Sequence, residues 1–252
     1  MFNTTKRLGL IIIGLAIAFP TLADVNTAAV KAAVSNPARS SADQTRDKTS
    51  RPDLVLQFFG VQPDMHVLDL FSGGGYYSEL LSYVVGPEGH VIAHTNKAYE
   101  SSSGEEALAR LKDNRLANVS RQITEIDNLG LEKASLDMVL MVLTYHDIYY
   151  TGDSWPKVDR DRLFSQIRES LKPGGILAVV DHSAIVGTGS SAAQGLHRID
   201  EVFARQDIES AGFVFDGASE ALRNPDDART LDVFNAAIRG NTDRFIYRFV
   251  KK

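Results

Sequence analysis

Short apolar segments alternate with amphipathic segments along most of the chain. The apolar segments predict seven strands, at 66–71, 90–95, 119–125, 136–143, 176–181, 213–219 and 244–250. The amphipathic segments predict helices at 76–84, 102–112, 158–171 and 199–211. Because buried strands that alternate with helices are typical of a parallel sheet covered on both faces, the pattern predicts a doubly wound α/β fold.

The composition fits a single globular domain of ordinary size. The chain has 252 residues, of which 44% are hydrophobic and 23% charged, so it has enough apolar material for a full core. Its net charge of -5 gives no basic surface for a phosphate backbone, and we expect no nucleic-acid partner. The absence of cysteine excludes disulfides, thiolate metal sites and a cysteine nucleophile.

The N-terminus has the features of a secretory signal. Lys6 and Arg7 precede an uncharged apolar run at 8–19, which is too short to span about 30 Å of hydrocarbon as a helix. Ala23, with Thr21 two residues before it, makes an acceptable cleavage site, so 1–23 is predicted to be a signal peptide. Cleavage would leave a periplasmic or secreted protein of net charge -7 without stable membrane insertion. An uncleaved signal anchor is the alternative.

The mature chain is expected to divide into a short arm and one domain. Residues 24–51 are rich in small and polar residues, which predicts an arm or a weak helix, and Pro52 stands where a helix can begin. The domain is then 52–252. Within it, 222–243 is a polar insertion, more consistent with a long surface loop than with a lid. Arg198 is expected to pair with acidic neighbours on a solvated helix face.

A glycine-rich turn follows the first predicted strand and precedes a helix. Gly73, Gly74 and Gly75 have no Cβ atoms, so the backbone can approach a ligand closely. The free N–H groups at the start of the next helix suit a carboxylate or another anion. The turn is therefore predicted to bind a small molecule, with a tight turn that holds no ligand as the alternative.

Two motifs carry a family resemblance over about 52–252. They are Asp-Leu-Phe-Ser-Gly-Gly-Gly at 69–75 and Leu-Lys-Pro-Gly-Gly at 171–175. With these motifs the chain resembles class I S-adenosylmethionine-dependent methyltransferases, and more closely a group of predicted exported bacterial methyltransferases of undefined substrate. The resemblance implies a Rossmann-like seven-stranded sheet with helices on both faces and an antiparallel last strand. It also implies that the amino-acid part of S-adenosyl-L-methionine lies over the glycine turn.

The resemblance assigns a set of cofactor contacts. They are Asp69, Phe71, Gly73, Gly74, Gly75, Asn96, and Glu125 or Asp127. Phe71 stands at the first glycine of the family turn, where its side chain is expected to narrow the approach. Asn96 follows the second strand in place of the usual acidic residue, and its amide oxygen is expected to accept a weaker bond from the ribose. The spacing does not decide between Glu125 and Asp127 for the adenine amino group.

Two His/Asp pairs carry the strongest signal for chemistry. His146-Asp147 follows the fourth predicted strand and Asp181-His182 follows the fifth, so all four are expected to face the crevice at the switch point of the sheet. We predict that His146 is a general base and that Asp147 or Asp181 orients it or grips the substrate. Ordinary strand-end positions are the alternative for each histidine. Another is a divalent-metal site that also uses His182 and His197.

The leading hypothesis is a methyltransferase that acts on an unidentified small molecule with S-adenosyl-L-methionine as methyl donor. An exported protein works where little of this cytosolic cofactor is expected, which opposes the hypothesis. One alternative is an exported domain that has kept the fold, lost the cofactor and binds another small ligand. The other is a His/Asp metal-dependent enzyme.

Overall fold

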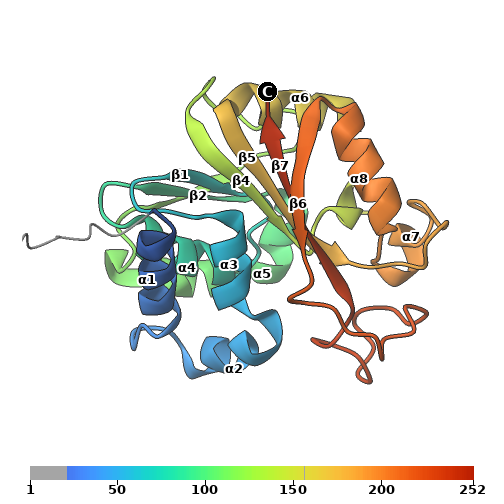
Figure 1. Ribbon diagram of the computed structural model, residues 1–252, viewed down its shortest axis with the longest axis horizontal. Coiled ribbons are helices and arrows are strands. Elements are labelled where there is room, and N and C mark those ends of the chain that lie inside the picture. The colour runs from blue at the N-terminus through green and yellow to red at the C-terminus, as the bar shows by residue number, and fades with distance from the viewer. Residues whose placement is uncertain (1–21, 156) are drawn as a thin grey trace, which may run out of the picture.

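The computed structural model describes residues 22–155 and 157–252, and side chains from Asn26 onward. The predicted signal peptide, 1–23, lies outside these residues except for its last two. Figure 1 shows one twisted sheet with helices on both sides and the C-terminus at the end of β7. In the part of the chain that is described, no helix is long and apolar enough to cross a membrane.

The sheet has seven strands in the order β3-β2-β1-β4-β5-β7-β6. Their bounds are β1 His66–Asp69, β2 His90–Thr95, β3 Val119–Ile123, β4 Leu136–Val142, β5 Leu171–His182, β6 Phe213–Ser219 and β7 Arg244–Lys251. β7 runs antiparallel to both of its neighbours, β5 and β6. The predicted fold class is therefore confirmed. β4 pairs directly with β1, whereas β5 lies one strand further out.

Helices cover both faces of the sheet. The helices are α1 Leu22–Val34, α2 Ser41–Ser50, α3 Pro52–Phe59, α4 Tyr76–Val85, α5 Lys97–Leu111, α6 Arg160–Ser170, α7 Ala193–Leu196 and α8 Glu201–Ser210. Alternate strand residues point to opposite faces, so Val67 packs in the core under α1, α3 and α4, and Leu68 in the core under α6 and α8. Helices therefore cover both hydrophobic cores. In a sheet of this kind a ligand site is expected beyond the carboxyl ends of the strands.

Several element boundaries differ from the prediction, and for three of them the structure shows a local reason. β1 ends at Asp69, because the backbone turns into the left-handed region at Phe71 (φ +58°). α5 begins at Lys97, five residues early, because the Asn96 side chain accepts the N–H of Tyr99 and caps the helix. β5 begins early at Leu171, which pairs with β4 across a register shift.

The segment predicted to be an arm or a weak helix forms two helices, α1 and α2. Val30 and Ala33 on α1 are buried in the core that α1 shares with α3 and α4. Ser40 caps α2 by accepting the N–H of Asp43. As predicted, Pro52 begins α3. Proline has no N–H group, but in the first turn of a helix that group has no partner within the helix, so no hydrogen bond is lost. The segment therefore packs on the domain rather than extending from it.

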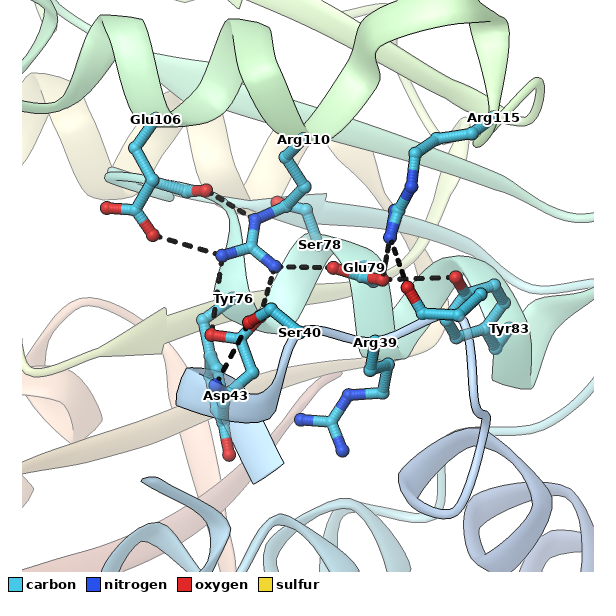
Figure 2. Close-up of polar contacts among 12 residues, drawn as sticks. Arg39, Ser40, Asp43, Tyr76, Ser78, Glu79, Tyr83, Glu106, Arg110 and Arg115 are labelled. Carbon is cyan, nitrogen blue, oxygen red and sulfur yellow. Dashed lines mark hydrogen bonds and ion pairs between the residues drawn. The ribbon is translucent and has the colours of Figure 1, made fainter. Parts of the chain in front are cut away.

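An ion-pair network joins α2 to the glycine turn (Figure 2). The Arg110 guanidinium on α5 donates to Asp43 at 2.6 Å, to the carboxylate of Glu79, and to the main-chain oxygen of Gly74 at 2.6 Å. Arg115 also binds Glu79, which is almost fully buried. One cation thus ties an N-terminal helix, α4 and the turn together.

The insertion at 222–243 consists of turns, with neither helix nor strand. Contrary to the prediction, Arg198 is fully buried and pairs with Asp227 of this segment at 2.8 and 3.1 Å, not with acids on its own helix. The reason is that Arg198 lies before α8, which begins only at Glu201 after the Asp200 cap. The loop is therefore fastened to the domain by a buried ion pair.

Candidate active site

The glycine turn has the backbone that a close ligand approach needs. Gly73 (φ +55°) and Gly75 (φ +80°) lie in the left-handed region, which glycine adopts without strain. The turn lines a cavity of about 180 Å³ together with Asp69, Tyr99 and Thr144. The hydroxyl oxygen of Thr144 is buried and has no hydrogen-bond partner among the described residues. This cavity fits the polar amino-acid end of the predicted cofactor.

Asp69 is a buried acid at the start of this turn. Its carboxylate accepts the hydroxyl of Ser78 at 2.6 Å. Burial, partly offset by the bonds from Ser78, raises the pKa of Asp69 to about 7, because the ionised form loses its hydration. A nearby positive charge on a ligand would reverse this effect and favour the carboxylate.

The side chain of Phe71 lines the cavity at the glycine turn, where a glycine would leave open space. Its ring stacks on Tyr99 with centroids 5.5 Å apart and contacts Trp155 at 5.3 Å and His94 at 5.5 Å. The side chain is 3% exposed. The expected narrowing thus comes from an aromatic cluster that also fixes Tyr99 and Trp155 beside the turn.

The amide oxygen of Asn96, which is predicted to accept a bond from the ribose, has a partner within the protein. That oxygen accepts the N–H of Tyr99 at 3.0 Å, as the cap of α5. The Nδ2 group is buried and has no partner among the described residues, so Asn96 offers a donor to a ligand. Glu125 and Asp127 both line a larger cavity of about 510 Å³ with Lys97 and Ala98. The structure therefore keeps both acids as candidates for the adenine end.

His146 lies at the end of β4, in the short helix η2 His146–Ile148, and is held by Asp181. Nδ1 of His146 lies 2.8 Å from Oδ1 of Asp181, whose other oxygen accepts the main-chain N–H of His146 at 2.7 Å. Nε2 faces Oδ1 of Asp147 at 3.4 Å. The predicted grouping of His146, Asp147 and Asp181 is therefore present, with Asp181 as the orienting carboxylate.

Two aromatic side chains, Tyr99 and Trp155, donate hydrogen bonds to Asp147, and the sequence did not predict this contact. Tyr99 donates its hydroxyl to Oδ2 of Asp147 at 2.6 Å, and Trp155 donates Nε1–H to the main-chain oxygen of Asp147 at 2.9 Å. All three residues line a cavity of about 200 Å³ with His197. Tyr99 stands three residues after a helix cap, a position that carries no functional signal in the sequence.

Nearby charges shift the pKa values of His146 and His182 in opposite directions. Burial lowers the pKa of His146, but the carboxylates of Asp181 and Asp147 overcome it and raise the pKa to about 9. This environment favours the protonated ring, which opposes the predicted role of His146 as general base. Burial and nearby positive groups hold the pKa of His182 well below its usual value, and Nδ1 of its ring bonds the hydroxyl of Thr242 at 2.6 Å. His182 therefore lies beside the site, 6.1 Å from His146 between ring centroids.

Comparison with known proteins gives the family. The model of a methyltransferase domain matches residues 62–212, more than half of the chain. The chain belongs to this methyltransferase domain family. Residues 62–212 of this methyltransferase contain the glycine turn and both His/Asp pairs. This match confirms the predicted enzyme class, a methyltransferase.

Two curated relatives are named for different substrates, and a solved structure shares the fold. The arsenite methyltransferase of Halobacterium salinarum is 29% identical over 124 residues, which are 49% of this chain and 29% of that protein. The protein-L-isoaspartate O-methyltransferase of Triticum aestivum is 30% identical over 129 residues, 47% of this chain and 46% of that protein. The methyltransferase thus matches less than half the length of these curated relatives. A solved S-adenosylmethionine-dependent methyltransferase from Aquifex aeolicus shares the fold, with a TM-score of 0.59, 20% identity and coverage of 84% of this chain and 98% of that one.

Proposed function

We propose that this methyltransferase transfers a methyl group from S-adenosyl-L-methionine to a small molecule bound in the 200 Å³ cavity. One observation carries the proposal: Tyr99 lines both the cavity at the glycine turn and the cavity at Asp147 and His197. A cofactor over the turn and an acceptor beside Asp147 would therefore meet at one side chain. This arrangement supports alignment of the reacting atoms, which is the main requirement of the reaction.

The residues present fit the cofactor. The turn gives close access at Gly73. Two buried polar groups, Nδ2 of Asn96 and the hydroxyl of Thr144, have no partner in the described part of the chain and are available to a ligand. When bound, the cofactor supplies a methyl group on a positively charged sulfur. The acceptor atom would form a bond to the methyl carbon while the carbon–sulfur bond breaks, and the acceptor proton would pass to the carboxylate of Asp147.

The acceptor is proposed to be an oxygen or nitrogen compound rather than arsenite. Arsenic(III) is a soft centre that thiolates bind well, and the chain has no cysteine. The cavity lining of Tyr99, Asp147, Tyr150 and His197 is polar and aromatic, which suits a small ring or chain that carries a hydroxyl or amine. We also keep export as a proposal, on the basis of the charged and apolar pattern of the N-terminus.

Cofactor binding at the turn is tested by Gly73→Val with Gly60→Val as matched control. Both glycines lie in the left-handed region, at φ +55° and +75°, so both variants carry backbone strain, but Gly60 ends α3 and does not line the cavity. Calorimetric titration with S-adenosyl-L-methionine should show at least about tenfold weaker binding for Gly73→Val alone. Circular dichroism establishes that both variants are folded. Equal affinity in the two folded variants would refute the assignment of the turn.

A further inference from the structure

Three ligand-type side chains converge beside the 200 Å³ cavity, which Asp147 and His197 line. His146, Asp147 and His197 each offer one nitrogen or oxygen atom, and these atoms lie within 4.8 Å of one another. The first two belong to η2 and the third follows α7, so tertiary packing brings them together. Methyl transfer by itself needs only alignment and a proton acceptor, which the carboxylate of Asp147 can supply, so the two imidazoles beside it are unexplained.

The orientation of His146 is the one found in metal-binding histidines. When its ring is neutral, Nδ1–H donates to Asp181 at 2.8 Å and the Nε2 lone pair is directed away from Asp181. A carboxylate on the outer nitrogen fixes the tautomer of a metal ligand in the same way and makes it more basic. Asp181 also accepts the main-chain N–H groups of His146 and His182 at 2.7 Å each, so this carboxylate cannot rotate freely.

The separation of the first two ligand atoms matches a shared ion. Nε2 of His146 and Oδ1 of Asp147 are 3.4 Å apart. Two ligands that each lie about 2.1 Å from a tetrahedral ion are separated by about 3.4 Å. The rings of His146 and His197 have centroids 5.5 Å apart and planes at 86°, so the third ligand approaches from a different direction.

The other two ligands are also held from outside. Tyr99 occupies Oδ2 of Asp147 with its hydroxyl at 2.6 Å, which leaves Oδ1 toward His146. His197 has a left-handed backbone (φ +51°), and its ring lies between Tyr150 and Phe234, with each centroid 5.0 Å away. A non-glycine residue in this conformation is strained and persists only where the surroundings impose it.

We propose that His146, Asp147 and His197 bind a first-row divalent cation, such as Zn²⁺, Mn²⁺ or Fe²⁺. Two imidazoles and one carboxylate suit these ions and leave coordination positions open. Because Asp147 and His197 line the 200 Å³ cavity, the open positions face the acceptor. This inference rests on the proposed function. A cation here would favour methyl acceptors that bind it through an oxygen atom, above all a hydroxyl, because a bound cation makes the hydroxyl proton easier to lose.

Cobalt binding to the full mature chain tests the site without any methyl acceptor. Titration of metal-free protein with Co²⁺ should give one equivalent with visible absorption bands, and Zn²⁺ should displace it. His197→Gln and Asp147→Asn, both of nearly unchanged volume, should weaken Co²⁺ binding at least about 100-fold, and Asp181→Asn about 10–100-fold as an outer-sphere change. Circular dichroism checks that each variant is folded.

His90→Ala is the matched control, because His66 and His90 form another imidazole pair with centroids 6.3 Å apart, at the opposite ends of their strands from the turn. Unchanged Co²⁺ affinity in His90→Ala supports the site. Absence of Co²⁺ binding in the wild-type protein, or its loss in His90→Ala with retention in His197→Gln, would overturn it. Titration of the same metal-free protein with S-adenosyl-L-methionine reports on the proposed function separately, because the glycine turn contributes no ligand to the cation.

Discussion

Asp69 carries a carboxyl group that the fold buries at the end of β1, and Asp69→Asn measures the cost of that burial. Burial raises the pKa of this group from 3.8 to about 7. Between these values the folded chain holds a proton that the unfolded chain has released. Stability therefore falls as the pH rises from about 4 to about 7, which is opposite to the usual behaviour of a paired carboxylate.

The size of the effect follows from the shift. A difference of about 3 pKa units corresponds to about 4 kcal/mol of lost stability once the group is fully ionised. Part of this loss is already present at about pH 5, because the unfolded carboxyl is ionised there. Between about pH 5 and about pH 8 the wild-type protein should therefore lose about 3 kcal/mol relative to Asp69→Asn, which cannot ionise.

Urea unfolding of both proteins at a series of pH values is the assay, because the difference between the two curves removes other titrating groups. Ser78→Ala should extend the loss to higher pH, since the hydroxyl of Ser78 stabilises the ionised form of Asp69. Saturating S-adenosyl-L-methionine, a cation, should reduce the loss if it binds beside Asp69. Parallel stability curves for wild type and Asp69→Asn would refute the reasoning.

Two further predictions concern the loop and the N-terminus. Arg198→Met leaves the carboxylate of Asp227 buried without its cation and should lower the free energy of unfolding by about 3–5 kcal/mol, measured in urea. A loss below about 1 kcal/mol would show that the ion pair does not anchor the loop. If export occurs, N-terminal sequencing of periplasmic protein should begin at or close to Asp24, whereas an intact Met1 in the membrane fraction would establish an anchor.

Local sequence determined the elements of this methyltransferase. Alternation of apolar strands with amphipathic helices was sufficient for the fold class, because periodicity reports which face of each element is buried. The glycines at 73–75 identified the turn, because glycine adopts the left-handed backbone found at Gly73 and Gly75 without strain. The helix cap at Asn96 is also a local signal, because an asparagine side chain that caps a helix fixes the start of α5 at Lys97.

Tertiary packing alone decided how the site is assembled. Tyr99 and Asp147 are 48 residues apart, and Arg110 reaches Asp43 across 67, so no local pattern encodes either contact. Arg198 has the sequence context of a surface residue, yet the turn before α8 directs it inward to Asp227. The pattern of apolar residues in a segment shows which of its faces is buried in the core. Contacts between polar groups depend instead on which loops and which ends of strands lie close together in space.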